Sequence, residues 1–172
     1  MTVSTEYLAA LAVAGTACAI DLRTRRIPNV LTFGASAVAL LFHAAVDGGT
    51  GVAHAGGGWL VGVAFFFVPF ALGGLGAGDV KLLGALGAWL GPMKALWVGL
   101  YASVAGGVVA IVVALAVGYL PQMFRNIYLL LTHWRVAGVK PVDGFTLSTG
   151  KGPRLAYAAP ILAGTIAALW LK

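Results

Sequence analysis

Two aspartates are the residues of this chain whose type and position could do chemistry. The 172-residue sequence has five acidic residues, and Asp21 and Asp79 each lie at the edge of a long apolar segment. An acid beside or inside a membrane segment is costly to keep there and usually has a function. Two carboxylates brought together can hydrolyse a peptide bond, one ionised to activate water and the other protonated to polarise the carbonyl. The pair therefore predicts an aspartyl protease.

The local positions of the two acids suggest different roles. Asp79 follows Gly78 and is expected to cap the N-terminus of a helix, where a carboxylate is favoured. Asp21 lies at the C-terminal end of the first apolar segment, where the helix dipole disfavours an anion. This favours Asp79 as the base and Asp21 as the initial acid. Positive charges close to Asp21 oppose the argument, so the two roles stay open; these charges are Arg23, Arg25 and Arg26.

The composition predicts an integral membrane protein. Hydrophobic residues make up 60% of the chain and charged residues 9%, whereas a soluble domain carries about 25% charged residues. The net charge of +6 comes from basic residues that flank apolar segments, which fits membrane topology better than nucleic-acid binding. The single cysteine, Cys18, excludes an intrachain disulfide or a cysteine metal cluster. We expect no metal and no cofactor.

Six apolar segments predict an all-α bundle of about six transmembrane helices in one domain, 1–172. The fourth segment, 79–91, would span about 20 Å as a helix, which is short of a hydrocarbon core of about 30 Å. Either this helix continues past Pro92 with a kink, or the run 73–78 dips into the membrane. The predicted spans are 4–20, 30–46, 55–72, 79–91, 94–118 and 155–171.

Basic residues predict the orientation of these spans. If the loop after the first span is cytoplasmic, nine of the eleven Lys and Arg residues lie inside, and Lys94 and Lys172 lie outside. This bias follows the positive-inside rule and puts both aspartates on the cytoplasmic side. The cytoplasmic loop 119–153 contains an amphipathic helix, predicted to lie on the inner leaflet or to dock substrate. Its apolar positions are Met123, Ile127, Leu130 and Trp134.

The glycines are expected to serve two purposes. The run 73–78 ends in an acid, and a backbone without Cβ atoms could approach an extended substrate closely and bind its main chain. Glycines elsewhere are expected to pack membrane helices together. The pairs of this second kind are Gly58/Gly62, Gly87/Gly91 and Gly106/Gly107.

Two short motifs resemble those of a known family, the type IV prepilin peptidases, which are GxGD intramembrane aspartyl proteases. The first is Asp21-Leu22-Arg23 followed by Ile27-Pro28-Asn29, and the second is Gly76-Ala77-Gly78-Asp79-Val80-Lys81-Leu82. The late segment 155–160 is also similar to the last span of the family. The two motifs lie on separate spans with matching topology, so the resemblance covers most of the chain.

The resemblance implies a specific activity. Such enzymes are multi-pass proteins of the bacterial or archaeal cytoplasmic membrane, and they remove the short basic leader of prepilins or pseudopilins at the cytoplasmic face. Asp21 and Asp79 match the catalytic pair. The remaining motif residues would support geometry or substrate binding; they are Arg23, Pro28, Asn29, Gly76, Gly78 and Lys81.

The chain lacks the cysteine-rich insertion that larger members carry, so N-methyltransferase activity is not expected. In size it resembles the small peptidases of tight-adherence, or Flp-type, pilus systems, and a related archaeal preflagellin group is an alternative. The expected partners are the prepilin substrate and the lipid bilayer, without nucleic acid.

Two other classes of function are compatible with membrane aspartates. A small transporter would use Asp21 and Asp79 to bind cations or relay protons, which predicts acids near the midplane and a sequence repeat. A non-enzymatic assembly factor of a pilus or secretion machine would tolerate replacement of either aspartate. The peptidase interpretation predicts that each replacement alone abolishes cleavage.

Overall fold

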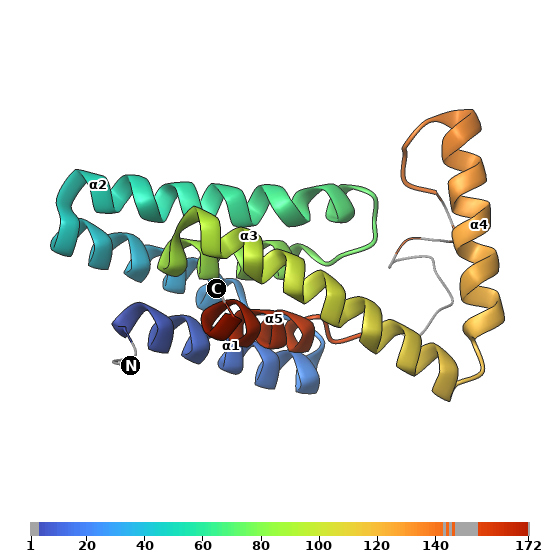
Figure 1. The fold of residues 1–172 in the computed structure, drawn as a ribbon, viewed down its shortest axis with the longest axis horizontal. Coiled ribbons are helices and arrows are strands. Elements are labelled where there is room, and N and C mark those ends of the chain that lie inside the picture. Colours follow the sequence, from blue (N-terminus) through green and yellow to red (C-terminus); the bar gives the residue numbers. More distant parts are fainter. Residues whose placement is uncertain (1–3, 143, 145, 147–154, 172) are drawn as a thin grey trace.

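The computed structural model describes residues 4–142, 144, 146 and 155–171, and it is all-helical over these residues (Figure 1). This confirms the all-α prediction. The first segment folds as α1 and the predicted amphipathic helix as α4, and the last apolar segment forms a short α5. The five helices are α1 (Thr5–Thr24), α2 (Asn29–Ala71), α3 (Ala77–Ala116), α4 (Leu120–Ala137) and α5 (Ala158–Leu171).

The long helix α2 folds back on itself at Gly48. This residue has φ 60° and ψ −135°, a conformation that glycine adopts at little cost. The rings of His43 and His54 lie 5.4 Å apart, although eleven residues of straight helix would rise about 16 Å. Figure 1 shows the two arms of α2 running in opposite directions.

The helix α3 reverses in the same way at Gly91, which has φ 80° and is followed by Pro92. Proline lacks the N–H that would continue the helical hydrogen bonds. A Cβ built on Gly87 would lie 3.1 Å from the Cβ of Ala95, on the other side of the break. Asp79 lies in the first turn of the first arm of α3, and the second arm leads towards α4 (Figure 1).

The described residues form five continuous helices where six separate helices were predicted, because α2 and α3 each contain two of the predicted segments as opposed arms. Segments 30–46 and 55–72 are joined in α2, and segments 79–91 and 94–118 are joined in α3. The physical reason is that Gly48 and Gly91 each turn the chain within a single residue, so no loop separates the segments. Three helices, α1, α2 and α3, are long and apolar enough to cross a membrane, and α5 is shorter, at 14 residues.

Glycines pack the second arm of α2 against the first arm of α3. A Cβ on Gly58 would overlap the backbone of Gly87, and a Cβ on Gly62 would overlap that of Leu83. The packing role predicted for Gly58, Gly62 and Gly87 is confirmed. For Gly107 the prediction is wrong, because a Cβ there would meet no atom within 4 Å.

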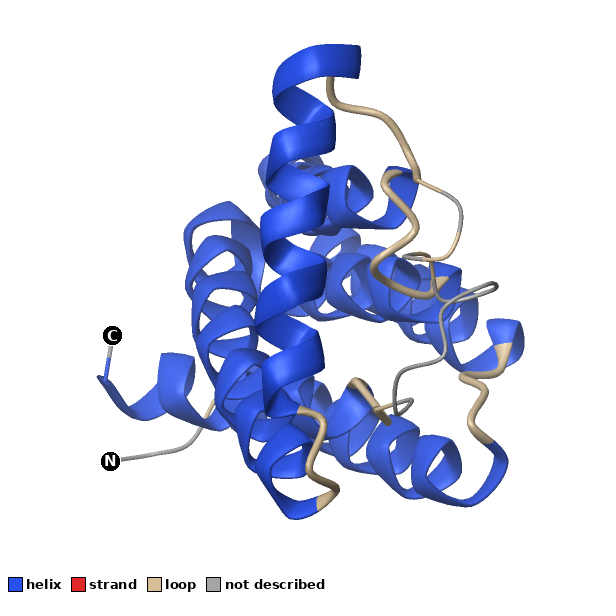
Figure 2. Cartoon of the chain, turned by 90° about the vertical axis from the view of Figure 1, so that its right-hand side faces the viewer, coloured by secondary structure: helices blue, strands red, loops and turns tan. Residues whose placement is uncertain are grey.

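The helix α4 runs crosswise to the bundle arms at one end of the molecule (Figure 1), and in the view onto that end it passes in front of the other helices (Figure 2). None of its residues is buried. It exposes an apolar stripe at helical spacing, made of Phe124, Ile127, Tyr128 and Leu131. Residues 143, 145 and 147–154 of the predicted loop lie outside the described residues.

Candidate active site

Three helix ends meet at one end of the bundle, and they position the predicted catalytic residues. The C-terminal end of α1 carries Asp21, the N-terminal end of α3 carries Asp79, and the N-terminus of α5 begins at Ala158; all three ends face the side of the molecule where α4 lies (Figure 1). The helix α1 ends shortly after Asp21, where Arg25 adopts a left-handed conformation and its N–H donates to the Asp21 carbonyl at 2.8 Å.

Asp79 is buried and held by the start of its own helix. Its Oδ2 accepts a hydrogen bond of 3.1 Å from the backbone N–H of Gly76, which forms one half of a capping box. This satisfies a donor that the helix itself leaves unpaired, and it confirms that Asp79 caps the helix. A Cβ on residue 76 would lie 3.1 Å from Asp79 Oδ2, so glycine leaves room for the carboxylate.

Asp21 is also buried, and its partner comes from the other end of the chain. Its Oδ2 accepts a hydrogen bond of 3.3 Å from the backbone N–H of Ala158, the first residue of α5. Asp21 thus lies against the N-terminus of a second helix, where negative charge is favoured. The prediction that Asp21 starts as the acid considered only the dipole at the C-terminal end of α1. In the structure each of the two carboxylates accepts a donor at a helix N-terminus.

The two aspartates are buried at the same end of the bundle. Both side chains are less than a tenth exposed, one in the last turns of α1 and the other in the first turn of α3. Two carboxylates held close together in a buried site resist being ionised at the same time. A pair of this kind can hold one proton between its members, which is the state that hydrolysis by two aspartates requires.

The first motif contacts the second through two further pairs of residues. The Lys81 ammonium donates to Asn29 Oδ1 at 2.9 Å and lies 5.2 Å from the centre of the Phe33 ring. A Cβ on Gly78 would lie 3.1 Å from the Cβ of Ile27, so a larger residue at position 78 would crowd the first motif. These contacts fix the start of α2 beside the start of α3.

The other predicted support residues lie at the surface of this region. Pro28 precedes α2, and its carbonyl accepts hydrogen bonds from Leu31 and Thr32, so it caps the helix with its backbone. Arg23 is exposed in the last turn of α1. Both residues are exposed, so neither belongs to the buried part of the site.

The glycine run offers less free backbone than the sequence suggested. The N–H of Gly73 donates to the Phe70 carbonyl and that of Gly74 to the Pro69 carbonyl, each at 2.8 Å. The N–H of Gly76 is taken by Asp79. These three donors close the end of α2 and cap α3, so they are not available to an extended substrate. Substrate binding by the rest of the run stays a prediction.

Comparison with known proteins agrees with this geometry. The sequence model of the type IV leader peptidase family matches residues 8–111. The chain belongs to the type IV leader peptidase family. It is therefore a peptidase and a membrane protein. Asp21, Asp79 and both motifs fall within the matched residues. Searches of the curated proteins and of the solved structures find no match.

The structure adds residues that sequence reasoning had not assigned to the site of this leader peptidase. They are Ala158, whose N–H donates to Asp21, and Tyr157, which precedes it and packs against Phe66 of α2. Both lie in the late segment that resembled the last span of the family. Pro160, in the first turn of α5, is the sequence signal for a helix start here, but nothing in the sequence pairs that start with Asp21.

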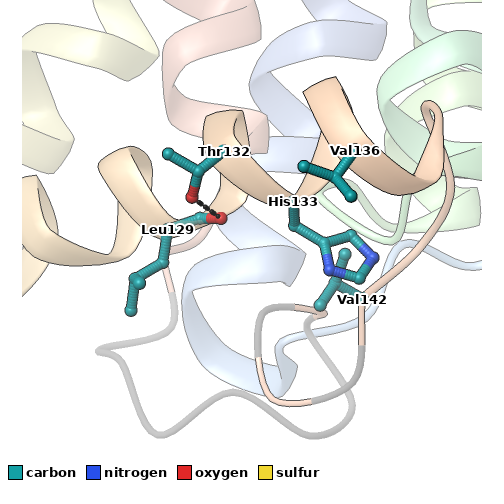
Figure 3. Close-up of a pocket in the computed structure, with 5 residues that line it drawn as sticks. All are labelled: Leu129, Thr132, His133, Val136 and Val142. Carbon is teal, nitrogen blue, oxygen red and sulfur yellow. Dashed lines mark hydrogen bonds between the residues drawn. The ribbon is translucent and has the colours of Figure 1, made fainter.

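A pocket of about 490 Å³ on α4 is separate from the aspartates (Figure 3). Four of its residues come from α4, namely Leu129, Thr132, His133 and Val136, and the fifth, Val142, comes from the segment after α4. Its one ionisable side chain, His133, has no second titratable partner in the lining. Among the described residues of this leader peptidase, no three His, Cys, Asp or Glu side chains are grouped as metal ligands.

Proposed function

We propose that this leader peptidase cleaves the basic leader from type IV prepilins of the Flp type, using Asp21 and Asp79 as a general acid–base pair. The observation that carries the proposal is the burial of both carboxylates at one end of the bundle, where each accepts a hydrogen bond from a backbone N–H at a helix N-terminus. The family match covers both residues.

The hydrolysis needs one proton shared by two carboxylates. The ionised aspartate takes a proton from water, and the resulting hydroxide attacks the scissile carbonyl carbon. The protonated aspartate donates to the carbonyl oxygen, which stabilises the tetrahedral intermediate. The first aspartate then passes its proton to the leaving amine, the C–N bond breaks, and the second aspartate takes a proton back from the diol as the carbonyl re-forms. Asp21 and Asp79 have similar backbone support, so either can start as the base.

The orientation proposed from the basic residues places this chemistry at the cytoplasmic face. A basic leader would approach from that side, and the hydrophobic helix of the prepilin would lie in the bilayer beside the enzyme. The helix α4 fits an interfacial position, because it combines exposed apolar residues with the basic residues Arg125 and Arg135. We propose that it rests on the inner leaflet and that the enzyme lacks N-methyltransferase activity.

Co-expression with a Flp-like prepilin tests the proposal. Wild type, Asp21→Asn and Asp79→Asn are compared at confirmed equal expression, and mass spectrometry of the product locates the cut. The expected result is removal of the leader by wild type and by neither variant. Cleavage that survives either replacement would contradict the two-aspartate mechanism and would favour a transporter or an assembly factor.

A further inference from the structure

We propose that Tyr157 is a positioning residue for the aspartate pair, because it fixes the N-terminus of α5 and thereby the backbone donor that holds Asp21. The inference rests on the proposed function and extends it to a residue outside the two motifs and outside residues 8–111. It also assigns a purpose to Gly106 on α3, whose missing side chain makes room for the Tyr157 ring.

Tyr157 is held by two other helices. Its hydroxyl donates to the Ala102 carbonyl at 3.4 Å, on the second arm of α3. Its ring packs edge-on against Phe66 of α2, with centroids 5.8 Å apart and planes at 72°. A tyrosine with a partner for its ring and for its hydroxyl has one preferred position.

The position of Tyr157 is transmitted directly to Asp21. The donor to Asp21 is the N–H of the next residue, Ala158, and the two residues share one planar peptide group. A shift of the Tyr157 backbone therefore moves this donor. The tyrosine therefore acts on Asp21 through the backbone and not through its own side chain.

The site for the ring depends on glycine at position 106. A Cβ on Gly106 would lie 2.6 Å from Tyr157 Cε2 and 2.7 Å from its hydroxyl oxygen, which is closer than real Cβ contacts allow. The adjacent Gly107 points to open space, where a Cβ would meet nothing within 4 Å. Alanine at position 106 must displace the tyrosine, and alanine at position 107 has nothing to displace. The two glycines therefore form a matched pair on one helix.

The test compares Gly106→Ala with Gly107→Ala in the full-length enzyme in lipid nanodiscs, with Tyr157→Phe as the conservative variant. We expect Gly106→Ala to lower kcat for prepilin cleavage by about tenfold or more with little change in KM, because a displaced catalytic group costs rate rather than binding. Gly107→Ala should stay within about twofold of wild type. Tyr157→Phe keeps the ring in place and should lose less activity than Tyr157→Ala.

Hydrogen exchange of the Ala158 amide gives a second measurement that needs no peptidase activity. The amide should exchange slowly in wild type and Gly107→Ala and faster in Gly106→Ala. If the Ala158 amide exchanges equally fast and kcat is equal in the two glycine variants, Tyr157 does not position the aspartates. The same conclusion follows if Gly106→Ala lowers only the melting temperature and leaves kcat and amide exchange unchanged. If wild type cleaves no prepilin, the proposed function fails, and the exchange comparison still decides whether Tyr157 holds the donor.

Discussion

Replacing Gly62 by alanine should impair the enzyme through a backbone contact close to Asp79. Gly62 lies on the second arm of α2, against Leu83 and Gly84 of α3. Leu83 is one helical turn after Asp79, on the same arm. The added methyl group would overlap the Leu83 carbonyl oxygen and lie 2.8 Å from its carbon. Because both atoms belong to helical backbone, the arm itself must move.

The size of the effect follows from that distance. Ordinary van der Waals contact begins at 3.4 Å, so the carbon contact must open from 2.8 to 3.4 Å, a movement of about 0.6 Å. A misplacement of about 1 Å can cost roughly 10²-fold in rate. We therefore expect a loss of about tenfold to a hundredfold in kcat, together with about 1–3 kcal/mol of overpacking strain.

Gly56→Ala on the same arm is the matched control, because a Cβ there would meet no atom within 4 Å. It should retain wild-type activity and be slightly more stable, since alanine favours a helix over glycine by about 0.5–1 kcal/mol. The assay measures prepilin cleavage at saturating substrate and the melting temperature of each purified variant. If Gly62→Ala cleaves as fast as Gly56→Ala, the tight crossing of α2 and α3 does not position Asp79.

Three further outcomes follow from the site. Lys81→Met and Asn29→Ala should each slow cleavage. A double-mutant cycle should show a coupling of about 1 kcal/mol between the two residues, which is typical of one hydrogen bond. Additive effects would argue that the 2.9 Å contact between Lys81 and Asn29 is unimportant. Asp79→Asn should keep the melting temperature close to wild type, because the amide oxygen can still accept from Gly76, whereas Asp79→Ala should cost about 1 kcal/mol; equal melting temperatures would refute the cap. EDTA should leave cleavage unchanged, because the described residues contain no cluster of three or more His, Cys, Asp or Glu side chains that could hold a metal ion. Inhibition that added metal reverses would show that a metal takes part.

Local sequence signals predicted much of the fold and the main part of the site. Asp79 after a glycine indicated a helix cap, and the capping hydrogen bond to Gly76 is present. The amphipathic pattern in 119–153 predicted α4. Such features depend on neighbouring residues, so the sequence carries them directly. The number of helices was wrong, because hydropathy shows that Gly48 and Gly91 interrupt apolar segments but not that they reverse the chain without a loop.

Contacts between distant segments could not be predicted in the same way. The hydrogen bond from Ala158 to Asp21 joins residues 137 positions apart, and it exists because α5 packs against both α1 and α3. This contact removed the basis for making Asp21 the acid. Gly106 and Gly107 are chemically identical neighbours, yet one faces Tyr157 and the other faces open space. The two glycines differ only in the helix face on which they lie, and the sequence does not show which face meets Tyr157.

The most direct test of the account measures cleavage rates of a purified Flp-like prepilin by Asp21→Asn, Asp79→Asn and the double variant, with melting temperatures to confirm folding. If the two carboxylates act as one unit, each single replacement lowers kcat by about 10³-fold or more, and the double variant is no slower than the slower single variant. A folded single variant that cleaves within about tenfold of wild type would contradict the account, because two-aspartate hydrolysis leaves no second base or acid to replace the lost group.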